Sequence, residues 1–130
     1  MAISSIFQQN DASTAQTNIP NVSSNSYVDT TDVRSPAFPI PNLNVPTSYS
    51  GFRILITVNV DATTDVSETF DLLGTSDGSQ WAMSQNSVQS INGTTNVVFS
   101  IDPAGQISYT STVVNPGFVK RTLQWLKQVL

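Results

Sequence analysis

From residue 51 onward, apolar residues recur at every second position of this chain. In the segment GFRILITVNV, residues 51–60, the even positions are all apolar and the odd positions are mostly polar. A period of two is that of a β-strand with one buried face, because successive side chains point to opposite sides of a sheet. Similar runs follow, separated by turn dipeptides such as Asp77-Gly78 and Asn92-Gly93. The sequence predicts an all-β fold, an antiparallel β-sandwich of jelly-roll type, over residues 51–130.

These runs supply one set of inward-facing apolar residues. We expect them to form the core of the domain or an interface between subunits, the usual role of aromatic residues in small sheet proteins, although rings such as Trp81 could also stack on carbohydrate. The expected residues are Phe52, Ile54, Ile56, Val58, Phe70, Leu72, Trp81, Met83, Val97, Phe99, Ile101, Ile107, Tyr109, Leu123 and Trp125.

The last segment, FVKRTLQWLKQVL (118–130), fits two periods. A helix would align Val119, Leu123, Leu126 and Leu130. A strand would align Val119, Leu123, Trp125 and Val129 on a face interrupted by Arg121 and Lys127. Periodicity does not distinguish the two. Because five strands and no helix precede this segment, we predict a short strand that pairs back into the sheet.

The first 50 residues follow a different pattern. They contain five of the seven prolines, most of them in the run SPAFPIPNLNVP (35–46). Proline fixes φ and lacks a backbone donor, so this run predicts neither a helix nor a central strand. We predict an extended Pro-rich arm over residues 1–50 that lies on neighbouring subunits; a disordered leader is the alternative. The expected arm contacts are Ile3, Ile6, Phe7, Ile19, Phe38, Ile40 and Leu43.

The chain contains neither cysteine nor histidine. This composition argues against disulfides, thiolate metal sites and the most common general base. Five of the nine acidic residues lie between residues 61 and 77, but their spacing matches neither an EF-hand loop nor a carboxylate pair for sugar cleavage. We expect Asp61, Asp65, Glu68, Asp71 and Asp77 on solvated faces and turns. We therefore predict no metal, no cofactor and no catalytic residue, and a protein that is not an enzyme.

The charge and hydropathy of the chain limit its partners. A net charge of -4 disfavours a nucleic-acid partner, because phosphate binding needs clustered Lys and Arg. No segment approaches the ~20 apolar residues of a membrane span. The first residues also lack the basic and apolar regions of a signal peptide. We expect no nucleic acid, no membrane and no secretion.

Several phrases, in a fixed order, resemble a β-rich module of structural proteins in tailed bacteriophages and large algal viruses. They are ETFDLLGT (68–75), WAMSQ (81–85), VVFSIDPAGQISYTST (97–112) and GFVKRTLQWL (117–126). The chain departs from the module in TFDLLGT, where a Tyr-Glu phrase is usual, and in RTLQWLKQVL, where a Lys-Phe-Arg ending is more common. The resemblance implies an oligomeric, often trimeric virion component of tail fibres, head fibres or capsid appendages, and not an enzyme.

From the resemblance and the predicted arm, we expect a capsid cement or decoration protein that stabilises the phage head. Its partners would be its own copies, as a homo-oligomer and most often a trimer, and the major capsid protein or another virion protein. It would be made in the host cytoplasm and located on the virion. The alternative is a tail-fibre or head-fibre protein that binds the host surface, although no repeat or heptad pattern of a long shaft is present.

Overall fold

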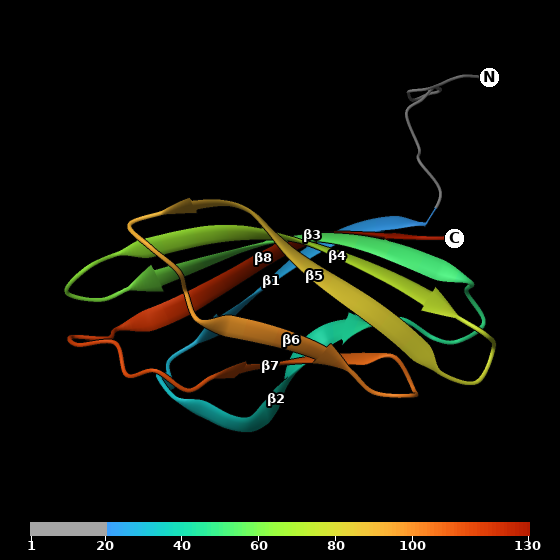
Figure 1. Cartoon of the computed structure of the whole chain (residues 1–130), viewed down its shortest axis with the longest axis horizontal. Helices are drawn as coiled ribbons and strands as arrows, with labels where there is room; N and C mark the ends of the chain where they lie inside the picture. Colours follow the sequence, from blue (N-terminus) through green and yellow to red (C-terminus); the bar gives the residue numbers. More distant parts are fainter. Residues whose placement is uncertain (1–20) are drawn as a thin grey trace.

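The structure, a computed structural model, describes residues 21–130. Every regular element of this part is a strand: β1 (Val22–Asp29), β2 (Arg34–Asn44), β3 (Gly51–Asp61), β4 (Val66–Ser76), β5 (Trp81–Ile91), β6 (Val97–Ile101), β7 (Gln106–Ser111) and β8 (Lys120–Val129). Two antiparallel sheets, ordered β1-β8-β3-β4-β5 and β2-β7-β6, lie one above the other (Figure 1). The prediction of an antiparallel all-β sandwich is confirmed.

The core lies between the two sheets. β3 runs through the middle of the larger sheet, and its even residues face inward and are buried. Phe99 of β6 meets Phe70 of β4 edge-on, with ring centroids 5.3 Å apart. All of the predicted core residues are buried except Met83 and Ile101, which are half-buried and pack against the core. The period-two pattern of the sequence therefore corresponds to the inner faces of both sheets.

The last segment forms a strand rather than a helix, and this strand is not short. β8 has ten residues and lies between β1 and β3, with antiparallel pairing on both sides. Its inner face carries Leu123, Trp125 and Val129 together with Arg121, which is fully buried. Of the two positive charges that interrupt the apolar pattern, Arg121 is therefore placed inside the protein, whereas Lys127 is half-buried.

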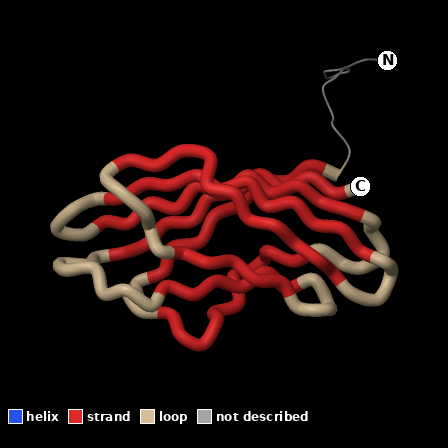
Figure 2. Tube along the Cα trace, in the orientation of Figure 1, coloured by secondary structure: helices blue, strands red, loops and turns tan. Residues whose placement is uncertain are grey.

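The structure corrects the extent of the predicted arm. Residues 22–44 form β1 and β2, which pair with β8 and β7 and so belong to the β-domain (Figure 2). β2 contains three prolines and lies at the edge of its sheet, where a missing N–H need not break a ladder of hydrogen bonds. The Pro-rich run is thus neither a helix nor a central strand, as predicted, but it is an edge strand and not an arm.

Three of the expected arm contacts pack within the chain itself. Ile40 and Leu43 are fully buried, and Phe38 is half-buried between Tyr27 and Tyr109. The expectation that Ile40 and Leu43 contact neighbouring subunits is corrected, because the pairing of β2 with β7 turns them into the chain's own core. The remaining expected contacts, Ile3, Ile6, Phe7 and Ile19, lie outside the described residues.

A partly buried polar cluster joins the two sheets beside the β1–β2 connection; we call it the Arg121 cluster. It comprises Asp29, Thr31, Asp32, Arg34, Tyr109, Ser111 and Arg121. Arg121 donates from Nη1 to the Tyr109 hydroxyl at 3.1 Å and to the Thr31 carbonyl at 3.2 Å. Its Nη2 donates to the Ser111 hydroxyl at 3.0 Å and to the Asp32 carbonyl at 2.9 Å. One guanidinium therefore ties β8 to β7 and to the β1–β2 connection.

Asp29 is the anionic centre of the Arg121 cluster. Its carboxylate accepts two hydrogen bonds from Arg34, at 2.7 and 2.8 Å, and a further one from the Tyr109 hydroxyl. Burial raises the pKa of this carboxyl, but these hydrogen bonds and one from the Thr31 amide outweigh burial and hold its pKa below the ordinary value. Burial, together with the hydrogen bond to Asp29, raises the pKa of Tyr109 to about 12.

None of the residues from 21 to 130 forms a helix long and apolar enough to cross a membrane.

Candidate functional site

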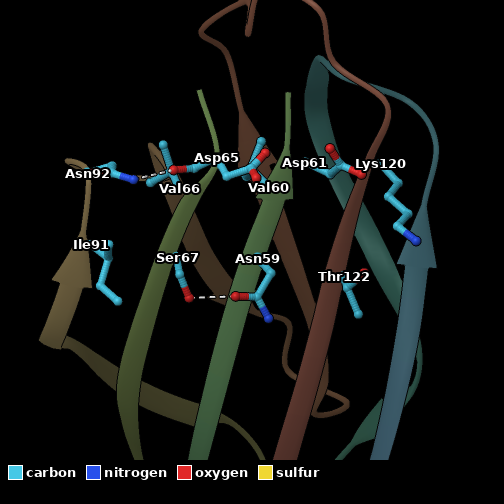
Figure 3. A pocket seen from close by; sticks show the side chains of 10 residues that line it. All are labelled: Asn59, Val60, Asp61, Asp65, Val66, Ser67, Ile91, Asn92, Lys120 and Thr122. Carbon is cyan, nitrogen blue, oxygen red and sulfur yellow. Dashed lines mark hydrogen bonds between the residues drawn. The ribbon is translucent and has the colours of Figure 1, made fainter. Parts of the chain in front are cut away.

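A depression of about 290 Å³ lies on the outer face of the five-stranded sheet, where β3 ends and β4 begins; we call it the trough (Figure 3). It is lined by Asn59, Val60, Asp61, Asp65, Val66, Ser67, Ile91, Asn92, Lys120 and Thr122. These residues come from β3, β4, β5, β8 and the adjoining loops. The trough thus gathers polar groups from segments that are far apart in the sequence.

Strand register brings the polar side chains of the trough together. Asn59 of β3 is paired with Ser67 of β4 on one side and with Thr122 of β8 on the other. One step further along β3, Asp61 is paired with Lys120. Because side chains alternate along a strand, these odd-numbered β3 residues face away from the core while their even-numbered neighbours are buried.

Hydrogen bonds within the trough fix the orientation of its amide groups. The Ser67 hydroxyl donates to Asn59 Oδ1 at 2.5 Å, so this bond engages the amide oxygen of Asn59 and not its Nδ2 donors. The Asn92 Nδ2 donates to the backbone carbonyl of Asp65 at 3.0 Å, which leaves Asn92 Oδ1 as an acceptor. The Asp65 carboxylate also accepts the Ala62 amide at 3.1 Å and so holds the β3–β4 turn. Donors and acceptors are therefore both presented at fixed positions.

Glu68 anchors the loop that carries Asn92. Its side chain is buried, and Oε1 accepts hydrogen bonds from the Thr95 amide at 2.9 Å and the Thr95 hydroxyl at 2.8 Å. Its Oε2 accepts from the Ser87 hydroxyl at 2.6 Å. The expectation of a solvated Glu68 is corrected, because this carboxylate joins β4 to β5 and to the β5–β6 loop.

We expect Glu68→Gln to lower the free energy of unfolding at pH 7 by about 1–2 kcal/mol, since it replaces a hydrogen-bonded buried carboxylate. Burial raises the pKa of Glu68, but hydrogen bonds from Ser87, Thr95 and Thr94 outweigh it and lower the pKa below the ordinary 4.5. A lowered folded pKa stabilises the fold above the unfolded pKa, and this contribution is lost as pH falls below about 4.5. Urea denaturation should show the difference between wild type and variant shrinking from pH 7 to pH 3; a constant difference would contradict this role.

The other acidic residues of the 61–77 region do not converge on one point. Asp71 accepts two hydrogen bonds from Arg53, both at 3.0 Å, on the exposed face of the sheet. Asp77 accepts hydrogen bonds from Ser79 and Gln80 in the β4–β5 turn. Within residues 21–130, no group of three acidic, histidine or cysteine side chains is placed to hold a metal ion.

The rings of Trp81, Trp125 and Tyr109 are buried and so are not free to stack on a sugar. A hollow of about 450 Å³ lies beside Trp81, but this ring is buried and its indole N–H donates to the Val45 carbonyl at 2.9 Å. Trp125 and Tyr109 are also buried, and Tyr49 is half-buried against the core. The aromatic residues considered for carbohydrate stacking therefore serve packing.

The sequence predicts Asp61 and Asp65 on solvated faces and turns, and both are exposed, but it does not indicate the polar neighbours that share the trough with them. Asn59 and Ser67 could have been found, since they lie symmetrically about the turn that joins the two alternating runs. Lys120 could not, because its place beside Asp61 depends on the pairing of β8 with β3. The spacing of residues within either strand does not indicate that β3 and β8 pair.

No protein-family model and no curated protein sequence matches the chain. Among solved structures, the chain is similar to the tailspike protein of Acinetobacter phage vB_ApiP_P1, at 19% identity and a TM-score of 0.52 over 95% of this chain. It is also similar, at 15% identity and a TM-score of 0.48 over 87% of this chain, to gp49 of the Acinetobacter baumannii bacteriophage Fri1, a tailspike described as a capsular polysaccharide depolymerase. The chain spans 25% of the first protein and 22% of the second.

The first of these likenesses shows that the fold of this chain also occurs within a phage tailspike. The resemblance to β-rich modules of phage virion proteins is therefore supported at the level of the fold.

The comparisons correct the prediction that the protein is not an enzyme. That prediction depended on the absence of cysteine and histidine and on a resemblance to structural virion modules. The Fri1 tailspike, which the chain resembles over 87% of its own length, is described as a depolymerase. The absence of cysteine and histidine in this chain does not by itself exclude an enzyme, and the prediction is withdrawn.

Proposed function

We propose that this chain is a module of a phage tail appendage, a tailspike or tail fibre, that contacts the surface of the host cell. The observation that carries the proposal is the fold shared with a phage tailspike over 95% of this chain. The outer face of the five-stranded sheet supports it, since the trough on this face presents hydroxyl, amide and carboxylate groups to solvent. Such groups suit the many hydroxyls of a cell-surface polysaccharide.

The capsid cement function has less support than the tail-appendage function. It depended on an arm whose apolar residues lie on neighbouring subunits. Ile40 and Leu43, two of those residues, are buried in the chain's own core. A cement protein would therefore have to attach through other residues, whereas a tail-appendage module needs no such arm.

We further propose that the module acts as a homo-oligomer on the virion. A single shallow depression of about 290 Å³ offers few contacts to a polysaccharide. Several copies that engage a repeating polymer together raise the effective affinity by orders of magnitude without new contacts, roughly 10²–10⁴-fold. Repeated presentation thus makes a weak individual site useful for adsorption.

The proposal is tested by locating the protein on particles of the phage that encodes it. Gold-labelled antibodies raised against the purified chain should label the tail, and the purified chain should slow adsorption of the phage to its host. Heat-denatured protein is the control for nonspecific interference. Label spread evenly over the head, with no effect on adsorption, would favour the cement function and overturn the proposal.

A further inference from the structure

The trough carries more negative than positive charge. Asp61, Asp65 and Lys120 are its charged residues, and all three are exposed. Arg53 and Asp71, on the same face of the sheet, form a bidentate ion pair, so their charges compensate each other. A ligand that enters the trough therefore meets two carboxylates and one ammonium group.

The polar groups of the trough match hydroxyls rather than ions. A carboxylate can accept two hydrogen bonds, and neighbouring hydroxyls of a sugar ring can donate both. Nδ2 of Asn59 and the ammonium group of Lys120 can donate to sugar oxygens, and Oδ1 of Asn92 can accept. Figure 3 shows these side chains distributed along the trough rather than gathered at one point.

The size and walls of the trough suit a small polar ring. Its volume of about 290 Å³ is near the lower end of the volumes typical of small-ligand sites. Ile91, which is 61% exposed, adds an aliphatic surface at one end for the C–H face of a sugar. The trough therefore fits a sugar unit of a longer chain better than a bulky ligand.

The two amide side chains of the trough, those of Asn59 and Asn92, are held in place before any ligand binds. Ser67 fixes Asn59, and the Asp65 carbonyl fixes Asn92. Glu68 fixes the loop beyond Asn92 through Thr95. Binding would therefore order few side chains, which lowers the entropic cost of association.

We propose that the trough binds an uncharged, hydroxyl-rich saccharide unit and discriminates against acidic saccharides. This inference rests on the proposed function and names the ligand class of its site. An acidic sugar would place its carboxylate near Asp61 and Asp65, where like charges repel. Lys120, on the β8 side of the trough, can compensate for only one of them.

The experiment is an NMR titration of the full chain with two sets of trisaccharides at millimolar concentrations. The uncharged probes are maltotriose, cellotriose and N,N′,N″-triacetylchitotriose, and the acidic probe is trigalacturonic acid. We expect at least one uncharged probe to shift the side-chain amide signals of Asn59 and Asn92, and the acidic probe to bind about tenfold more weakly or worse. Absence of shifts with every uncharged probe, or equal binding of the acidic one, would overturn the proposal.

Three charge variants locate the effect. Asp61→Asn and Asp65→Asn should each weaken binding of the uncharged probe about three- to tenfold. Each should also reduce the ratio between the dissociation constants of trigalacturonic acid and the uncharged probe. Asp71→Asn removes the same charge from the same face but outside the trough. It should therefore change neither the affinity for the uncharged probe nor the discrimination against the acidic one. If all three variants behave alike, the discrimination arises from net charge and not from the trough.

The ligand class and the proposed function can fail separately. Tail labelling and slowed adsorption without shifts at Asn59 and Asn92 would overturn the ligand class and leave the tail-appendage function standing. Shifts with an uncharged probe, together with label on the head, would keep the saccharide site and overturn the tail-appendage function.

Discussion

Gly105→Ala is expected to lower the free energy of unfolding by at least ~3 kcal/mol, because two separate costs fall on this position. Gly105 has a φ of +94°, a conformation that L side chains rarely adopt. A Cβ at this position would also overlap the backbone carbonyl of Val45. Urea denaturation should show a lower midpoint for the variant. Tryptophan fluorescence is a suitable signal, because the Trp81 indole donates a hydrogen bond to the same Val45 carbonyl.

The close approach at Gly105 cannot be relieved by moving a side chain. The Val45 amide donates to the Gly105 carbonyl at 2.9 Å, so the two backbones are bonded at this point. Gly105 also donates to the Asp102 carbonyl at 2.9 Å and thereby closes the β6–β7 turn. To accommodate a methyl group, the end of β2 and this turn must separate, which also disturbs the Trp81 hydrogen bond.

Gly93→Ala is the matched control for Gly105→Ala. Gly93 also lies in a turn and has a φ of +108°, but a Cβ there would meet no atom within 4 Å. Gly93→Ala should lower the free energy of unfolding only by the backbone strain, about 1–2 kcal/mol. If the two variants unfold at the same denaturant concentration, the overlap with Val45 contributes nothing and the explanation is wrong.

The sequence predicts the strands of residues 51–130 well, because their information is local. A half-buried strand needs only alternation, and a hairpin needs only a turn such as Asn92-Gly93 between two such runs. β1 and β2 were not predicted as strands, because their sequences lack this local alternation. β1, VSSNSYVD, has few apolar residues, because it is an edge strand whose side chains are mostly exposed. Its pairing with β8 joins segments at opposite ends of the described chain.

The candidate site is less predictable than the fold, since it depends on which strands are neighbours. Asp61 and Lys120 are 59 positions apart in the sequence, and only the β3–β8 register pairs them. The same limit applies to buried polar groups. Arg121 and Glu68 suggest solvent exposure in the sequence, yet each is buried with several hydrogen-bond partners contributed by other segments.

Arg121→Met is expected to lower the free energy of unfolding by about 3–5 kcal/mol, because several buried or half-buried acceptors lose their donor at once. Methionine fills much of the volume of arginine but donates no hydrogen bond. The Ser111 hydroxyl and the carbonyls of Thr31 and Asp32 would each lose a donor in a buried or half-buried setting. Thermal unfolding should show a Tm lower by more than ~10 °C.

Arg53→Met is the control for charge and chain length. Like Arg121, Arg53 donates several hydrogen bonds, in its case two to the Asp71 carboxylate, but its side chain is 60% exposed. Exposed pairs contribute little, so this variant should cost less than about 1 kcal/mol. If Arg121→Met and Arg53→Met lower the free energy of unfolding equally, burial of the Arg121 cluster does not increase its contribution to stability.

Arg121→Lys separates charge from geometry in the same cluster. Lysine keeps the positive charge, but its single ammonium group cannot reproduce the two separate nitrogens that arginine directs at Tyr109 and Ser111. We expect it to lie between wild type and Arg121→Met in stability. Because Lys120 is adjacent on β8, a loosened Arg121 cluster should also weaken saccharide binding in the trough. Loss of stability with unchanged binding would show that the trough is positioned by β3 and β4 alone.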